Sequence, residues 1–477
     1  MDVVPALVSS HRRCAALACI AVLGTVGTVT VNPAFASSGV FAWGENSRGQ
    51  LGNGTTERSD VPVAVSGLNG ASAVAGGEDF SLALTNGTVM AWGENGFGQL
   101  GDGTAEGMSD VPVPVTGLSA VTAIAAGSNH GLALLSNETV MAWGYNAFGQ
   151  LGNGTTISSA VPVPVSGLSA VAAIAAGQNY SLALLRNGTV MAWGINESGE
   201  LGDGSTIQSD VPVPVGGLAG VTAIAAGNGV STALLQDGTV MDWGYNGQGQ
   251  LGDGSEGGVS TVPVAVSGLT AAGGMPNGGE SMALLNGGTV MDWGINGSGQ
   301  LGNGVEGGSS DVPVAVTGLS GATAIAGGLE HRLALLSNGS IMAWGNGSSG
   351  QLGNGVEGAS DVPVPVSGLT GMTAISAGKY FSLAASSQAV APAPAIARIK
   401  PNYGPASGGT TVTITGSNLS GATSVKFGTT DAATFVINSP TSITAVSPAE
   451  PDGTVDVTVT TSGGISPVSH HDRFRFH

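Results

Sequence analysis

The chain has almost no cysteine and little charge. Only two of its 477 residues are cysteine, Cys14 and Cys19, and both lie in an apolar N-terminal segment. Lys and Arg together number 12 against 31 Asp and Glu, so the formal net charge is −19. Because nucleic acids and anionic membranes attract cationic proteins, this balance disfavours both as partners. We expect no nucleic-acid binding, and no thiol nucleophile or thiolate metal site beyond the N-terminal segment.

The first 36 residues have the pattern of a secretory signal peptide. Arg12 and Arg13 precede an uncharged, mostly apolar stretch at 14–31, and residues 34–36 (Ala-Phe-Ala) match a cleavage site. An uncleaved membrane anchor is the alternative, because the stretch is about long enough to span a bilayer. Cleavage would leave 10 basic and 30 acidic residues, a net charge of −20. We therefore expect a secreted or cell-surface protein with no membrane span after cleavage.

Long helices are also not expected, because 82 residues are glycine and each glycine destabilises a helix interior by about 1 kcal/mol relative to alanine. Instead, the chain repeats itself every 49 to 51 residues. Every tryptophan lies in the same motif, followed by glycine and soon afterwards by Gly-Gln-Leu-Gly or a close variant. The seven are Trp43, Trp92, Trp143, Trp193, Trp243, Trp293 and Trp344. Their fixed place in the repeat predicts structural core residues that pack between repeats.

Each repeat predicts short strands. Residues 132–135 and 140–142 flank a tight turn, residues 121–125 form a further apolar run, and a Val-Pro-Val segment suits an outer edge strand. Such a unit cannot bury a face alone, and radial stacking of seven units buries all of them. The first unit lacks its early strands and the last lacks its late ones. We predict an all-β, seven-bladed propeller over residues 37–385, closed by pairing of these N- and C-terminal half-repeats. A linear β-solenoid is the alternative.

The repeat resembles that of the regulator of chromosome condensation family. The resemblance rests on Ala-Gly-x-x-His-Ser-Leu-Ala-Leu followed by Trp-Gly-x-Asn-x-x-Gly-Gln-Leu-Gly, and it covers residues 40–385. It implies a seven-bladed propeller. The chain departs from the pattern at residues 275–280 of the fifth unit, and at Asn346 and Gly347, where the other units have x-Asn.

A second, different segment follows the repeats. Residues 386–394 are an Ala/Pro/Ser linker, and residues 395–477 are rich in Thr, Ser and Val, with alternation at 411–415 and 455–459. This alternation predicts an antiparallel β-sandwich. The run from Ile399 to Thr410, with residues 416–419 and 425–428, resembles an IPT/TIG domain, an immunoglobulin-like module. In exported bacterial proteins this resemblance implies a spacer or adhesive unit.

Candidate binding residues occupy the position before the Ser-Leu-Ala-Leu strand, which varies although the units are otherwise nearly identical. In a propeller, equivalent positions form a ring on one face, and aromatic side chains there would anchor a partner. The alternative is a ring of buried filler side chains. The predicted binding face consists of Phe80, His130, Tyr180, Glu280, His331, Tyr380 and Phe381.

No cofactor, metal site or catalytic residue is predicted. A Gly-(Asn/Asp)-Gly motif recurs, and because Asn and Asp alternate freely there, we interpret it as a turn cap rather than a calcium site. Its polar members are Asn53, Asp102, Asn153, Asp203, Asp253, Asn303 and Asn354. His130 and His331 lie four units apart and should not share a metal. His470, His471 and His477 are interpreted as part of a frayed C-terminus.

We therefore predict a non-catalytic, monomeric binding scaffold whose propeller face recognises an unidentified protein or glycan. The resemblance also implies an alternative, since some secreted propellers of this repeat family inhibit β-lactamases through aromatic residues. Those aromatics occupy the two positions before His-Ser, where this chain has mostly polar residues and Tyr380. A guanine-nucleotide exchange activity, as in nuclear members, and a lyase-type propeller are further alternatives.

Overall fold

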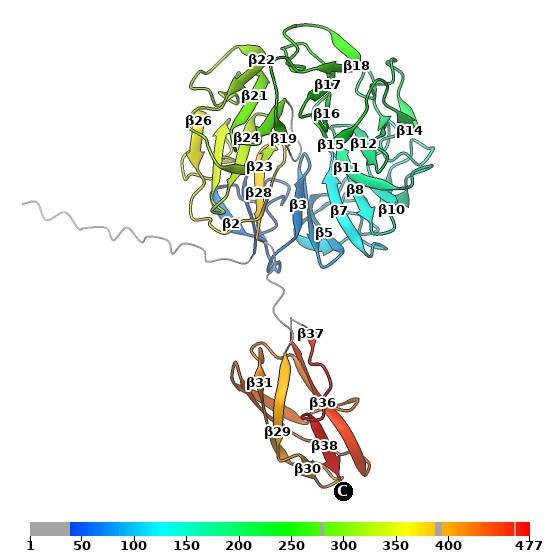
Figure 1. The fold of residues 1–477 in the computed structure, drawn as a ribbon, viewed down its shortest axis with the longest axis vertical. Coiled ribbons are helices and arrows are strands. Elements are labelled where there is room, and N and C mark those ends of the chain that lie inside the picture. Colours follow the sequence, from blue (N-terminus) through cyan, green and yellow to red (C-terminus); the bar gives the residue numbers. More distant parts are fainter. Residues whose placement is uncertain (1–38, 277–280, 387–393, 462–463) are drawn as a thin grey trace, which may run out of the picture.

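The computed structural model describes residues 39–276, 281–386, 394–461 and 464–477, and these form strands, turns and loops without a helix. Seven four-stranded antiparallel sheets form the blades of a propeller, arranged in a ring (Figure 1). The predicted signal peptide and most of the predicted linker lie outside the described residues.

We number the blades from the first complete one, and each is written from its inner to its outer strand. Blades 1 to 3 are β3 (Ala73–Gly76), β4 (Phe80–Thr85), β5 (Thr88–Glu94), β6 (Met108–Pro114); β7 (Val121–Ala126), β8 (His130–Leu135), β9 (Val140–Gly144), β10 (Ser159–Pro164); and β11 (Val171–Ala176), β12 (Tyr180–Leu185), β13 (Val190–Gly194), β14 (Ser209–Pro214). Blades 4 and 5 are β15 (Val221–Ala226), β16 (Val230–Leu235), β17 (Val240–Tyr245), β18 (Val259–Ala265); and β19 (Ala272–Gly274), β20 (Met282–Leu285), β21 (Val290–Ile295), β22 (Ser309–Ala315). Blades 6 and 7 are β23 (Ala322–Gly327), β24 (His331–Leu336), β25 (Ile341–Gly345), β26 (Ser360–Pro365); and β27 (Ala374–Ala377), β28 (Phe381–Ala385), β1 (Val40–Gly44), β2 (Ser59–Ala64).

Blade 7 closes the ring with strands from both ends of the repeat array. β1 pairs antiparallel with β28, and Val40 lies opposite Ala385 and Trp43 opposite Ser382. The pairing removes the two open edges that an unclosed array would leave. The predicted closure by N- and C-terminal half-repeats is confirmed, and the Val-Pro-Val segments form the outer edge strands, as predicted.

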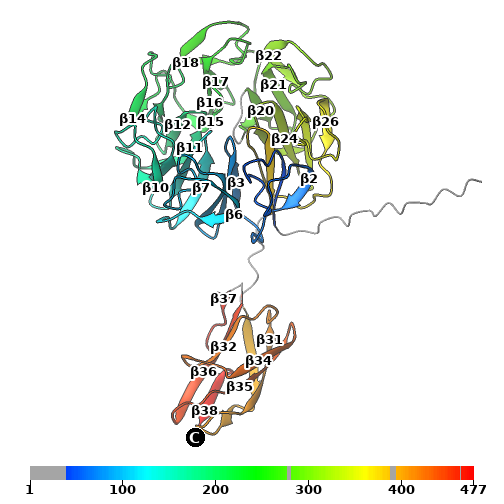
Figure 2. The same ribbon diagram turned by 180° about the vertical axis from the view of Figure 1, so that it is seen from behind.

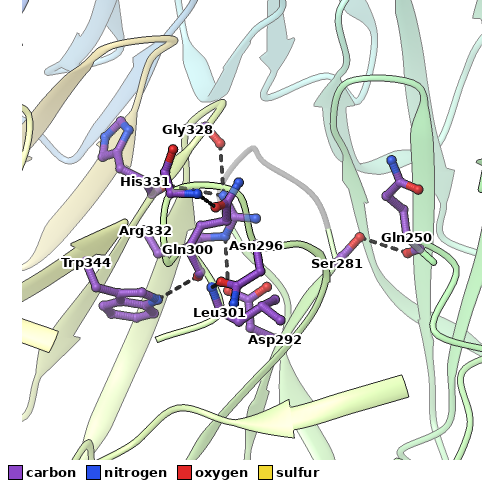
Figure 3. Close-up of polar contacts among 11 residues, drawn as sticks. Gln250, Ser281, Asp292, Asn296, Gln300, Leu301, Gly328, His331, Arg332 and Trp344 are labelled. Atoms are coloured by element: carbon purple, nitrogen blue, oxygen red, sulfur yellow. Dashed lines mark hydrogen bonds and ion pairs between the residues drawn. The ribbon is translucent and has the colours of Figure 1, made fainter. Parts of the chain in front are cut away.

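The tryptophans hold each blade to the one before it. All seven side chains are fully buried. Each indole Nε1 donates a hydrogen bond of 2.8–3.0 Å to the main-chain carbonyl of the Gly-Gln-Leu-Gly glutamine of the preceding blade, or of Glu200 in one unit. Figure 3 shows one such pair, Trp344 and Gln300. Each tryptophan therefore combines a large buried apolar area with a satisfied polar group.

Residues 394–461 and 464–477 form a β-sandwich (Figure 2). One sheet has the order β29 (Ala395–Lys400), β31 (Thr411–Ser417), β35 (Ser442–Val446), β34 (Thr434–Ser439). The other has the order β30 (Tyr403–Gly404), β38 (Arg473–Phe476), β36 (Gly453–Thr461), β32 (Ser424–Phe427), β33 (Thr430–Asp431), with β37 (Gly464–Ile465) paired to β36. Both alternating segments are strands, as predicted.

The prediction of a frayed C-terminus is wrong. β38 lies inside its sheet between β30 and β36, and Phe474 and Phe476 are buried against Phe427 in edge-on contacts. Asp472 is also buried, and it accepts the main-chain N–H of Ser469. The apolar alternation of Arg473–Phe476 anchors the end of the chain in the sandwich core.

Candidate binding face

One end of every blade carries two loops, which together build a face of the propeller. The first loop joins the inner strand to the second strand, and the longer one joins the third strand to the outer strand. In every blade except blade 5, whose shorter loop lies largely outside the described residues, the two loops are tied together. The residue after Trp-Gly donates its main-chain N–H to a carbonyl of the shorter loop. Glu94 donates to Asp79, Tyr145 to Asn129, and Asn346 to Glu330, at 2.8–2.9 Å.

The Gly-Gln-Leu-Gly loop of one blade extends to the next. Gln50 Nε2 donates to Asp79 Oδ1 at 3.1 Å, and Gln99 Nε2 donates to Asn129 Oδ1 at 3.2 Å. The following leucine is buried, and its N–H is accepted by a buried asparagine such as Asn95. Hydrogen bonds therefore fix the backbone of these loops, while the variable side chains differ from blade to blade.

The Gly-(Asn/Asp)-Gly residues are turn caps, as interpreted from the sequence. In all seven units the side-chain Oδ1 accepts the N–H of the residue two positions later, at 2.9–3.2 Å. No group of three or more His, Cys, Asp or Glu that could hold a metal ion occurs within the described ranges.

Most of the predicted binding ring is not on the surface. Phe80, His130, Tyr180, His331 and Phe381 are each 0% exposed. Their rings pack on the glycine three residues before them: a Cβ added to Gly77 would lie 2.1 Å from the Phe80 ring. The interpretation of these five residues as an exposed binding face therefore requires correction, because they are filler between blades. Glu280 lies outside the described residues.

The two histidines behave as aromatic filler with a polar edge. His130 Nε2 lies 3.0 Å from Ser181 Oγ, and His331 Nε2 lies 2.9 Å from Ser382 Oγ. Each serine hydroxyl donates to a main-chain carbonyl, so the imidazole Nε2 is the donor in the histidine–serine bond. Burial lowers the pKa of both histidines to about 3, which keeps them neutral. A buried serine already committed to a carbonyl does not serve as a nucleophile.

Tyr380 differs from the rest of the predicted ring, because it is half-buried on the face itself. It lies beside Lys379, whose ammonium group is 5.4 Å from the tyrosine ring centroid. Lys379 also forms an ion pair with Glu78 of blade 1. This pair stands at the edge of a central cavity of about 260 Å³. Six blades line the cavity, four with an Ala-Gly-x segment and blades 1 and 6 with Gly-Gly-x.

A partly exposed aromatic cluster was missed by the sequence analysis. Phe97 in blade 1 and Tyr145 in blade 2 have ring centroids 4.6 Å apart, and Phe148 lies 6.2 Å from Tyr145. Phe97 is 45% exposed, and Tyr245 in blade 4 is 42% exposed. A sequence signal for Tyr145 and Tyr245 was available, because the position after Trp-Gly also varies between units. It holds Glu45, Glu94, Tyr145, Ile195, Tyr245, Ile295 and Asn346.

Carboxylates gather beside the aromatic cluster, at the junction of blades 7 and 1. Arg48 Nε lies 3.3 Å from Glu94 Oε2, and Lys379 pairs with Glu78. Burial and the nearby carboxylate of Glu78 raise the pKa of Asp79, and Lys379 opposes them only in part. The carboxylates of Glu45, Glu78, Asp79 and Glu94 therefore outnumber the cations of Arg48 and Lys379 here.

Blades 5 and 6 meet through a buried ion pair that other blades lack. Arg332 Nε donates to Asp292 Oδ2 at 3.1 Å, and the two side chains are 5% and 0% exposed. Figure 3 shows this region, with Arg332 also donating to the carbonyl of Gly328. Five sister blades have Ala at the aspartate position and blade 4 has Asp242, while all six have Ser or Gly at the arginine position. The pair lies between blades and serves packing.

Comparison with known families agrees with this architecture. Residues 22–279, more than half of the chain, match the RCC1-like domain. The chain belongs to the RCC1-like family. The regulator of chromosome condensation (RCC1) repeat matches residues 288–335 and 338–385, and the IPT/TIG domain matches residues 394–476. No curated protein sequence matches the chain.

Solved structures of RCC1-like proteins are similar in fold. Prp20p from Saccharomyces cerevisiae is 23% identical with a TM-score of 0.65, and the match covers 74% of this chain and 92% of that one. Yeast RCC1 (Prp20), in a structure with Kap60, is 23% identical with a TM-score of 0.66, over 74% and 89%. Human WBSCR16 is 25% identical with a TM-score of 0.66, over 74% and 100%. These RCC1-like structures support the seven-bladed propeller.

The described part of the RCC1-like chain has no helix with the length and apolar character needed to cross a bilayer. The predicted signal peptide is outside that part.

Proposed function

We propose that this RCC1-like protein is an exported, non-catalytic binding scaffold. Its rigid propeller presents the loop face described above to a protein partner, and its IPT/TIG domain acts as a spacer or adhesive unit. The observation that carries the proposal is the aromatic cluster on this face, in which Phe97 is exposed and Tyr145 and Phe148 are half-buried. Aromatic side chains held on a rigid frame lose little entropy on binding and are typical anchors of protein interfaces.

Related proteins with this fold are consistent with a protein partner. Prp20p binds Gsp1p and histones, and yeast RCC1 is bound by Kap60. For the present chain, the N-terminal signal pattern and the net charge of −19 favour a partner outside the cytoplasm over a chromatin-associated one. The same aromatic cluster also favours a second candidate, in which the face blocks a secreted enzyme.

The test uses residues 37–477, immobilised and exposed to culture supernatant and cell-wall extract of the source organism. We expect a specific protein to be retained, and to be lost when Phe97→Ala, Tyr145→Ala and Phe148→Ala are combined. These side chains are exposed or half-buried, so their removal leaves the blade core intact. Identification of the retained protein by mass spectrometry distinguishes a structural partner from an inhibited enzyme.

The matched control is Tyr403→Ala, which removes a 61% exposed aromatic side chain from the sandwich. It should retain the same protein as the unaltered chain. Equal retention by the unaltered chain and the triple variant would contradict the proposed face.

A further inference from the structure

The part of the loop face on blades 7, 1 and 2 has two chemically different halves that adjoin one another. Phe97, Tyr145 and Phe148 form the aromatic half, on blades 1 and 2. Glu45, Glu78, Asp79 and Glu94 form the acidic half, on blades 7 and 1. Glu94 ends β5 and Phe97 follows three residues later in the adjoining loop, so the halves are continuous.

The acidic half contains more carboxylates than cations. Arg48 pairs with Glu94, and Lys379 pairs with Glu78. Glu45 and Asp79 have no ion-pair partner among the residues that the structure describes. Asp79 accepts the Gln50 side-chain amide, and Glu45 accepts the Ser47 main-chain N–H at 3.1 Å. Both are half-buried, so solvent screens their charges less than it screens a fully exposed pair.

The hydrogen bond that Asp79 accepts from Gln50 does not need the negative charge. In blades 2 and 3 the position of Asp79 is occupied by Asn129 and Asn179, and each of these asparagines accepts the same glutamine amide through its Oδ1. A neutral side-chain amide is therefore sufficient to accept the hydrogen bond that the glutamine donates. The negative charge of Asp79 is not needed for this hydrogen bond and is available to a partner.

On the basis of the proposed function, we propose that this face binds a protein segment that presents a lysine or arginine beside an apolar side chain. The cation lies against the carboxylates of Asp79 and Glu45, and the apolar side chain packs on Phe97 and Tyr145. An aromatic ring also attracts a cation to its face, an interaction that strengthens when the pair is desolvated. Charge complementarity commits the site to a basic protein surface, since polyanions and acidic peptides would be repelled.

The inference is tested by selecting a phage-displayed random peptide library on immobilised residues 37–477. We expect the enriched peptides to contain more Lys and Arg than the starting library, next to an apolar residue. Synthetic versions should bind more weakly as salt is raised, because salt screens exposed charges. The charge variant Glu45→Gln with Asp79→Asn should weaken their binding about three- to tenfold, as expected for two partly solvated ion pairs.

The charge variant is designed to leave the fold unchanged, because both substitutions keep the acceptor oxygen that the loop uses. Glu138→Gln, at the opposite end of blade 2, is the matched charge control and should bind the peptides like the unaltered chain. Enriched peptides without a basic excess, or binding unchanged in the charge variant, would overturn the inference. If such peptides still require Phe97, Tyr145 and Phe148, the proposed binding face stands while the basic partner does not. If no enriched peptide requires those three residues, both proposals fail.

Discussion

Arg332 on β24 donates a hydrogen bond to Asp292 on β21, and the pair is buried in the interface between blades 5 and 6. A buried ion pair adds little net stability because both groups lose their hydration, yet removal of one partner leaves an uncompensated charge. Five sister blades have Ala at the aspartate position. Blade 4 has the buried Asp242, which accepts the Trp293 indole N–H at 3.2 Å and has Ser281 as its counterpart in blade 5. The two substitutions therefore depend on each other.

This dependence predicts a non-additive mutant cycle. Asp292→Ala alone should lower the free energy of unfolding by about 3–5 kcal/mol, because it leaves a buried arginine without its carboxylate. Arg332→Ser alone should cost less, since blades 4 and 5 already combine the buried Asp242 with Ser281. The double variant should lose much less than the sum, because it recreates the interface of most other blades. Chemical denaturation of all four proteins measures the coupling. Additive losses would show that the two side chains act independently.

The same pair predicts how stability depends on pH. Burial raises the pKa of Asp292 to about 7, above its usual value, while Arg332 acts in the opposite direction. A raised carboxyl pKa means that the folded state binds the proton more tightly than the unfolded state. The stability from this group is thus complete below about pH 4 and is lost as pH rises through about 7. Relative to the Asp292→Ala, Arg332→Ser double variant, the unaltered protein should lose stability over this interval. A constant difference across it would contradict the assignment.

The histidines predict the opposite pH dependence. Burial lowers the pKa of His130 and His331 to about 3, so their contribution is present above about pH 6.5 and is lost as pH falls towards 3. His130→Phe with His331→Phe uses the side chain that Phe80 and Phe381 place at the same position. We expect this variant to fold and to unfold at lower pH than the unaltered protein in an acid titration followed by circular dichroism. An unchanged acid unfolding midpoint in this variant would contradict the assignment.

The repeat predicted much of the fold because packing constrains the same residues in every unit. The spacing of Trp43 to Trp344 and the missing half-units were sufficient to predict the blades and their closure. The face was harder to predict, since burial depends on which way a strand side chain points. Phe80 and Phe97 are both aromatic residues in variable positions, but Phe80 fills an interface and Phe97 stands in a loop. The ion pair of Asp292 and Arg332 joins residues 40 positions apart, which the repeat period alone does not bring together.

Two glycines offer a matched test of how tightly the blades pack. Gly101 has a φ of +63°, and a Cβ there would lie 2.9 Å from Trp143 of the next blade. Gly67 has a similar φ of +73°, but a Cβ there would have no atom within 4 Å. Gly67→Ala should therefore lower the free energy of unfolding by about 1–2 kcal/mol, from backbone strain alone. Gly101→Ala should lower the free energy of unfolding by about 1–3 kcal/mol more than Gly67→Ala does, because the indole must move from its carbonyl acceptor.

Denaturation followed by tryptophan fluorescence measures the loss of stability in both variants. Equal losses for the two variants would show that the tryptophan interface tolerates the added methyl group, which the close approach of Gly101 to Trp143 argues against.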